Sequence, residues 1–258
     1  MAREKEITII AITDHDTVNG VEEALYFSKK YNIEFIPGVE LSAMYNNLEV
    51  HIVGLYINWQ DDKFKKILNY FQRKRAERAK KIVRKLKEHG IKIELDELFE
   101  LQENINNIGR LHIAKLLVKK SYAKNVKDAF QKFLSEDRFA YVKKAKLDVE
   151  EAIKIIKEVK GISFLAHPAL LNIDFMIKEW KEKGLDGIEA FHPDHSNEDV
   201  ERYLKIGREY NMLISGGSDF HGTAREYSPI GYIKLPYKYL SLIHISEPTR
   251  PLYISYAV

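Results

Sequence analysis

The stretch Ile7-Thr8-Ile9-Ile10-Ala11-Ile12-Thr13-Asp14-His15-Asp16-Thr17 decides how the rest of the chain is interpreted. Its first half is an apolar, β-branched run typical of a buried strand, and its second half places an Asp-His-Asp cluster directly after it. A helical pattern begins at Val21. In parallel α/β folds, the loop between a strand and the next helix carries the catalytic groups. The stretch therefore predicts an α/β fold with a site at this edge; the alternative is that the two aspartates form a turn and a helix cap.

The order of an apolar strand followed by a carboxylate or a histidine recurs in the next segments. The strand predicted over 32–39 ends before Glu40, and the alternating run over 49–56 places His51 inside a strand. A buried core histidine is the alternative explanation for His51.

Three later predicted strands, over 162–166, 187–190 and 212–215, also end in chemically active side chains. Ligands collected from successive strand ends are what a barrel-type active site needs. These side chains are His167, His192, His195, Asp219 and His221.

The composition limits the class of protein and the kind of metal site. The 258 residues are 45% apolar and 31% charged, and no apolar run is long enough to cross a membrane. No signal-peptide pattern is visible at the start of this sequence. Because there is no cysteine, we expect any metal to be held by histidine and carboxylate, which suits Zn, Mn or Fe. We expect a cytoplasmic protein with no membrane contact and no obligate protein partner. The net charge of +3 is weak support for a nucleic-acid partner.

The segment 61–146 shows helical patterns and no strand pattern, which predicts an all-helical insertion. Its first helix begins at Asp61 or Asp62 and ends at His89, and shorter ones are predicted over 96–102, 111–120 and 126–134. One face of the first helix is basic, which indicates a solvated face or a phosphate-facing one. The basic face consists of Lys63, Lys66, Arg73, Lys74, Arg78, Lys81, Arg84 and Lys85.

The predicted domain order is a barrel interrupted by this insertion. The barrel comprises 1–60 and 147–240, with the insertion over 61–146 between them. Residues 241–258 are interpreted as a non-native tail, because 242–258 fits no helix or strand and 245–251 resembles a translated sequencing adaptor.

Seven motifs, in this order, resemble those of the polymerase and histidinol phosphatase (PHP) family. The resemblance is to its branch of nucleoside 3′,5′-bisphosphate phosphatases and 5′-to-3′ oligoribonucleases. The motifs are Thr-Asp-His-Asp at 13–16, Pro-Gly-Val-Glu at 37–40, His51, Gly-Arg-x-His at 109–112, Ala-His-Pro at 166–168, His-Pro-x-His at 192–195 and Gly-Ser-Asp-Phe-His-Gly at 217–222.

The resemblance implies a metal-dependent phosphatase or phosphodiesterase with a nucleotide or short oligonucleotide as substrate. The implied fold is a distorted (β/α)7 barrel with a helical insertion, and three divalent metals, Mn, Fe or Zn, would activate a water that attacks phosphorus in line. The resemblance implies that Glu40 bridges two metals, of which one is also held by His51 and His167 and the other by Asp219. The third metal would be shared by His15 and His221. The residues implied to bind the phosphate or to assist the leaving group are Arg110, His112, His192 and His195.

One motif of the family, a His-x-His at the end of the first strand, has no counterpart here. The resemblance therefore implies an N-terminally truncated barrel that lacks its first strand, in which Met1–Glu6 is the last turn of a helix and metal binding is impaired. The alternatives are a histidinol-phosphatase-like enzyme, another metal hydrolase, and a nucleic-acid-binding module with a decayed site.

Overall fold

The computed structural model describes residues 1–258 except 100–107, 144, 146, 223–227 and 246–258. The chain divides into two compact units. Met1–Lys65 and Leu147–Val258 form the first, here called the sheet unit, and Lys66–Lys146 form the second, the helical unit. The sequence predicts a helical insertion over 61–146, and the helical unit covers 66–146.

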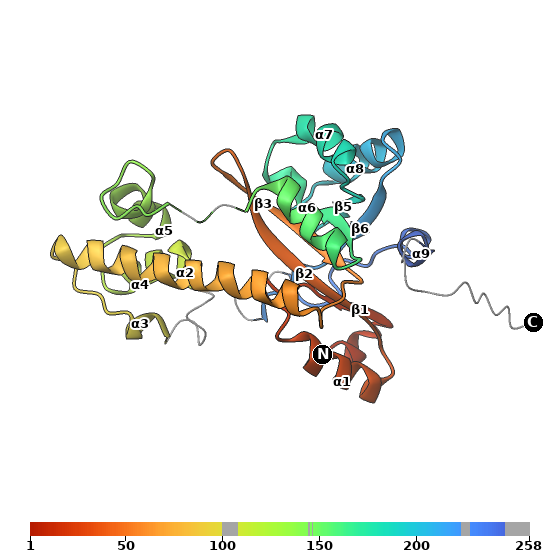
Figure 1. Cartoon of the computed structure of the whole chain (residues 1–258), viewed down its shortest axis with the longest axis horizontal. Coiled ribbons are helices and arrows are strands. Elements are labelled where there is room, and N and C mark those ends of the chain that lie inside the picture. The colour runs from red at the N-terminus through yellow and green to blue at the C-terminus, as the bar shows by residue number, and fades with distance from the viewer. Residues whose placement is uncertain (100–107, 144, 146, 223–227, 246–258) are drawn as a thin grey trace, which may run out of the picture. The chain divides into compact units, whose positions relative to one another are not determined.

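The described strands of the sheet unit form one curled half-barrel sheet, in which neighbours in the sheet are also neighbours in the chain (Figure 1). β1 is parallel to β2, and β4, β5 and β6 are parallel to one another. β3 is antiparallel to β2, because only Asn46 and Asn47 join the two strands and so short a connection forces a hairpin; β3 is also antiparallel to β4. The strands are β1 (Ile9–Ile12), β2 (Glu34–Tyr45), β3 (Leu48–Leu55), β4 (Ile162–Leu165), β5 (Gly187–Phe191) and β6 (Leu213–Gly216).

The α/β class is thus confirmed. The barrel count of seven strands stays a prediction.

Strand β2 is longer than predicted, and the expectation that a strand ends before Glu40 is wrong. The residues from Gly38 to Tyr45 pair with β3, so Glu40 lies in the middle of the strand. Pro37-Gly38 looked like a strand end because both residue types interrupt strands. Gly38 instead allows Thr13 to pack closely against the strand, since a Cβ at this position would lie 2.8 Å from Thr13 Cγ2.

Helices of the sheet unit pack against this sheet. Helix α6 contacts β2, β3 and β4 so closely that a Cβ on Gly54 would lie 2.9 Å from Ile156 Cγ1. Helix α8 packs on β5 and β6 and begins with a capping box formed by Ser196 and Asp199. The helices are α1 (Val21–Tyr31), α6 (Val149–Glu158), α7 (Ile177–Glu182), α8 (Asn197–Glu209) and α9 (Tyr237–Ile245), with 3-10 turns at Arg3–Lys5, Pro168–Leu170 and Asp174–Met176.

Helix α9 corrects one expectation about the end of the chain. The prediction that no helix or strand follows position 242 is wrong for 242–245, which belong to α9. The reason is apolar burial, because Ile243 is 1% exposed and packs in a cluster with Ile36 and Phe164. The rest of the predicted tail, 246–258, lies outside the described residues.

The helical unit has a core of its own. Helix α2 (Asp62–Glu88) begins where Asp61 Oδ1 accepts the Phe64 N–H, as predicted, and it is followed by α3 (Asp96–Phe99), α4 (Arg110–Lys119), α5 (Val126–Ala129) and a π-helical turn at Phe130–Leu134. Positions 100–102 of the helix predicted over 96–102 lie outside the described residues. The core includes Ile82, Leu86, Leu98, Ile113, Leu117 and Leu134.

Two cationic side chains of the predicted basic face, Arg78 and Lys85, bind backbone carbonyls instead of pointing freely into solvent. Arg78 Nε donates to Val142 O at 2.7 Å and Lys85 Nζ donates to Tyr141 O at 2.8 Å, and both side chains are half-buried. They attach α2 to the chain that follows the π-helical turn.

No described helix combines the length and the apolar character needed to cross a bilayer.

Candidate functional site

Six histidine rings form a continuous row of contacts in the sheet unit. The centroids of neighbouring rings lie between 4.8 and 5.9 Å apart. One ring comes from strand β3, and the others come from the loops after β1, β4, β5 and β6. The row brings together six of the histidines singled out from the sequence, in the order His221, His15, His51, His167, His192 and His195.

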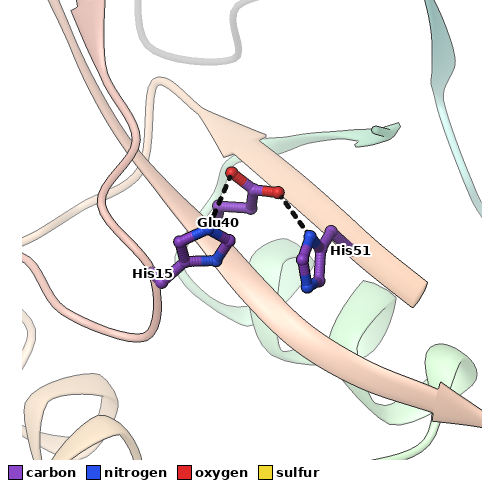
Figure 2. Close-up of side chains that lie close together, drawn as sticks. All are labelled: His15, Glu40 and His51. Atoms are coloured by element: carbon purple, nitrogen blue, oxygen red, sulfur yellow. Dashed lines mark ion pairs between the residues drawn. The ribbon is translucent and has the colours of Figure 1, made fainter. Parts of the chain in front are cut away.

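The carboxylate of Glu40 contacts three rings of this row. Figure 2 shows it between His15 and His51. Its Oε1 lies 2.9 Å from His51 Nδ1 and 3.3 Å from His167 Nε2, and its Oε2 lies 3.9 Å from His15 Nε2. Glu40 is only 6% exposed. The ligand atoms of His15, Glu40 and His51 all lie within 4.8 Å of one another, as a metal site requires.

Backbone hydrogen bonds place His15 beside Glu40. The Asp16 N–H donates to Glu40 O at 2.9 Å, and the Glu40 N–H donates to Asp14 O at 3.1 Å. Asp16 has a left-handed φ of 54°, and its Oδ1 accepts the Ser42 N–H at 2.8 Å. Asp16 is therefore a turn residue that fastens the loop to β2. The helix-cap alternative for the aspartates is wrong, since α1 has no side-chain cap.

His51 lies between two carboxylates. Its Nδ1 faces Glu40, and its Nε2 lies 3.6 Å from Glu49 Oε1. Burial alone would lower the pKa of His51, but Glu40 and Glu49 outweigh it and raise that pKa to about 9. Burial alone would likewise raise the pKa of Glu40, but the charge of His15 and the bonds to His167 and His51 hold it well below its usual range.

His167 is held by a carboxylate that the sequence analysis missed. Its backbone is left-handed, with φ 32° and ψ 51°, and its N–H donates to Glu189 Oε2 at 2.8 Å. Burial raises the pKa of Glu189 to about 8, although the charge of His167 opposes this rise. A glutamate between Ile188 and Ala190 in an otherwise apolar strand was the available signal.

A second carboxylate, Asp219, lies between two further rings. Its Oδ2 is 3.4 Å from His192 Nε2, and its Oδ1 is 3.3 Å from His221 Nδ1. His192 is buried. The Nδ1 of His195 lies 2.9 Å from Ala190 O, while its Nε2 is buried and has no hydrogen-bond partner among the described atoms.

The arrangement fits divalent metal ions. His51 Nδ1 and His167 Nε2 lie 3.1 Å apart and converge on the same oxygen of Glu40. The Nδ1 of His167 is buried without a hydrogen-bond partner in the described part of the chain. Converging ring nitrogens and a buried carboxylate are the donor set that Zn, Mn and Fe prefer over Mg and Ca.

Arg110 and His112 lie in the helical unit, at the start of α4. The Arg110 guanidinium lies 5.6 Å from the Phe130 ring centroid and 5.7 Å from that of Tyr141. His112 Nδ1 accepts the Gly109 N–H at 3.1 Å. Their predicted role in phosphate binding stays a prediction.

Comparison with known proteins gives consistent results. No protein-family model matches the chain. It is 31% identical to a 5′-3′ exoribonuclease of Haemophilus influenzae over 89% of this chain and 82% of that protein, and 29% identical to a 3′,5′-nucleoside bisphosphate phosphatase of Chromobacterium violaceum over 87% and 80%. The crystal structure of a protein of Bifidobacterium adolescentis, assigned as a metal-dependent phosphoesterase, matches with a TM-score of 0.80 at 26% identity, over 95% of this chain and 88% of that one.

Proposed function

Because this chain belongs to the PHP family of metal-dependent phosphoesterases, we propose that it hydrolyses phosphate esters of nucleotides. The substrates we propose are nucleoside 3′,5′-bisphosphates and the 5′ ends of short RNA, because the relative from Chromobacterium violaceum is named a 3′,5′-nucleoside bisphosphate phosphatase and that from Haemophilus influenzae a 5′-3′ exoribonuclease. The observation that carries the proposal is Glu40 among His15, His51 and His167, since a buried carboxylate with imidazoles on both oxygens is suited to bridging metal ions.

We propose three divalent metal sites for Mn, Fe or Zn, built from the two carboxylate groups of the row. Bound metals would activate water and neutralise negative charge on the phosphoryl oxygens. Glu40 would bridge two of them, and the remaining ligands would be His51 and His167 on one, Asp219 on the other, and His15 with His221 on the third.

His192 and His195 are proposed to contact the phosphate or the leaving group. Burial lowers the pKa of His195, so its ring is neutral near pH 7. With Nδ1 donating to Ala190 O, the Nε2 of this neutral ring is an acceptor. His195 can therefore donate to a leaving oxygen only after it has taken up a proton. Arg110 and His112 are proposed to bind phosphate.

The experiment uses the purified chain, stripped with EDTA and then supplied with Mn²⁺, and measures inorganic phosphate released from the phosphomonoesters and mononucleotides released from the RNA. The substrates are a 3′,5′-bisphosphorylated nucleoside, a 5′-phosphorylated oligoribonucleotide and histidinol phosphate, and the bound metal is measured in parallel. We expect metal-dependent turnover of one or both nucleotide substrates.

Each alternative gives a different result in this assay. Turnover of histidinol phosphate alone would transfer the assignment to that branch of the family. A chain that binds metal but hydrolyses none of the three would refute nucleotide hydrolysis, and a chain that binds no metal would support a nucleic-acid-binding module with a decayed site. The predicted cytoplasmic location stays a prediction.

A further inference from the structure

One face of helix α2 in the helical unit presents a row of exposed, mainly cationic side chains. They recur every three or four positions, which places them on one side of the helix. This side is opposite the buried positions, which include Leu68, Ala79 and Leu86. The row, here called the α2 stripe, consists of Lys66, Tyr70, Arg73, Glu77, Lys80, Arg84 and Lys87, and all seven are exposed.

The charge of α2 is out of proportion to that of the chain. The helix carries twelve Lys and Arg residues against three acidic ones, whereas the whole chain has a net charge of only +3. The rest of the chain is therefore acidic on balance. A polyanion approaching this chain would be attracted to α2 and repelled by much of the remainder.

Several cations of the stripe are available to an incoming anion. Neither Lys66 nor Lys80 forms an ion pair among the residues that the structure describes. Arg84 and Lys87 form exposed surface pairs, at 3.7 Å to Glu88 and 2.7 Å to Glu94. Exposed pairs of this kind are weak and are readily exchanged for a phosphate contact.

The length of the stripe suits a chain of phosphates better than a single one. Its two ends, Lys66 and Lys87, lie 21 positions apart, which corresponds to about 31 Å of helix, or about nine phosphates of a stacked strand. Lys66, Arg73, Lys80 and Lys87 follow one another at about 10.5 Å, which is close to the Debye length of about 10 Å at 0.1 M salt. A polyanion lying along the stripe can therefore interact with several of these charges at once, whereas a mononucleotide is too short to do so.

An aromatic ring lies within this basic row. Tyr70 is 45% exposed, and Lys74 Nζ lies 5.7 Å from its ring centroid. Exposed aromatic rings beside cations are the platforms on which the bases of single-stranded nucleic acids stack. Apart from this ring the stripe has no apolar side chain, so it lacks the apolar face with which an amphipathic helix enters a lipid surface.

We propose that the α2 stripe binds the phosphate backbone of single-stranded RNA, with Tyr70 as a stacking platform. This inference rests on the proposed function, and it favours oligoribonucleotides over mononucleotides as the substrate class. Binding along the stripe is independent of the sequence of the RNA and sensitive to salt.

The test compares two triple variants of the full chain. In the stripe variant, Lys66→Gln, Arg73→Gln and Lys80→Gln are combined. The matched control combines Lys178→Gln, Lys205→Gln and Arg208→Gln, which removes the same number of charges from exposed positions on α7 and α8. Fluorescence anisotropy with a 5′-phosphorylated 12-nucleotide single-stranded RNA in EDTA measures binding without any need for turnover.

We expect the stripe variant to weaken RNA binding at least tenfold at low salt and to reduce the slope of log K against log salt by up to about 2. The control variant should bind as the parent chain does, and Tyr70→Ala should weaken binding about tenfold. The kinetic constants for a 3′,5′-bisphosphorylated nucleoside should be unchanged in the stripe variant.

Equal losses in both triple variants, or no loss in the stripe variant, would overturn the proposal. If the parent chain binds phosphatidylserine vesicles and the stripe variant does not, while RNA binding is the same in both, the surface would be reassigned to lipid. Failure of the proposed function has a separate signature, because the parent chain would then bind RNA in EDTA but, with Mn²⁺, release neither phosphate from a bisphosphorylated nucleoside nor mononucleotides from RNA.

Discussion

The two carboxylate oxygens of Glu40 contact three imidazoles, those of His15, His51 and His167. Glu40→Gln keeps the size of the side chain but removes its charge and one acceptor, so we expect the variant to lose bound Mn²⁺ or to lower kcat by orders of magnitude. Metal analysis of the dialysed protein and phosphate release measure the two effects. Near-normal metal content together with a near-normal rate would refute the bridging role.

His51 makes the stability of the metal-free chain depend on pH. Its folded pKa of about 9 lies above the ordinary value of 6.5, so its contribution to stability is complete below pH 6.5 and is lost as the pH rises through 9. The raised pKa of Glu189 adds a loss between pH 4.5 and about 8. We expect the Tm in EDTA to fall between pH 6.5 and 9.

His51→Gln isolates the contribution of His51, because glutamine does not titrate. The fall in Tm should be smaller in this variant than in the parent chain, with the contribution of Glu189 remaining. An identical pH dependence of Tm in the two proteins would show that Glu40 and Glu49 do not raise the pKa of His51.

Glu189 is expected to position His167 rather than to bind metal itself. Its Oε2 accepts the N–H of a residue with a left-handed backbone, a conformation that costs free energy in a residue other than glycine. Glu189→Leu should lower metal affinity 10–100-fold, as the loss of an outer hydrogen bond to a ligand does. Glu189→Gln keeps an oxygen acceptor and should stay within a few-fold of the parent chain in a calorimetric Mn²⁺ titration.

The two Glu189 variants distinguish the hydrogen bond from the charge. If the glutamine variant loses as much affinity as the leucine variant, then the negative charge matters and the positioning role is refuted. Circular dichroism of both variants at 25 °C checks that each remains folded.

Single residues differ in how far the sequence predicted their place. His15, His167 and Asp219 could be recognised because each lies within three residues of the end of its own strand, which is a local pattern. Glu49 and Glu189 were not recognised, because each acts on a histidine whose need for a partner becomes clear only after the strands pair. Positions defined by contacts across the sheet leave little trace in a local pattern.

At the scale of elements, the start of α8 controls the segment that carries His195. Ser196 Oγ accepts the Asp199 N–H at 3.1 Å, and Asp199 Oδ2 accepts the Ser196 N–H at 3.0 Å. We expect Ser196→Ala to destabilise the chain by about 1 kcal/mol and to lower the Tm by about 2–4 °C. Ser196→Thr keeps the acceptor and serves as the control, and a Tm lowered equally by both substitutions would contradict the capping role.

The helices were predictable because their signals are local. The caps at Asp61 and Ser196 and the stop at Gly90, whose φ is 79°, lie within a few residues of the helix ends they define. Strand β2 was cut short because the Pro37-Gly38 pair is a local signal for an end, whereas eight residues of pairing with β3 carry the strand onward to Tyr45. Strand length is thus decided by the partner strand, which local patterns do not contain.

At the scale of the whole molecule, the order of strands in the sheet is easier to predict from the sequence than the arrangement of the site. A sheet whose neighbours follow chain order could be anticipated from alternating strands and helices, but the antiparallel pairing of β2 with β3 follows from the two-residue turn between them. The site then arises from the sheet, because five separate segments between His15 and His221 supply the histidine row.

Metal binding should therefore stabilise the two units unequally. The histidine row and both carboxylates lie in the sheet unit, whereas the helical unit has a separate core of its own. A ligand that binds only the folded state stabilises it by about 2.7 kcal/mol at a hundredfold excess over Kd. Hydrogen exchange measured with and without Mn²⁺ should show slower exchange in β1–β6 and little change in the amides of α2 and α4. Equal slowing in both units would mean that they open as one cooperative body, so that metal binding at the histidine row stabilises the whole chain.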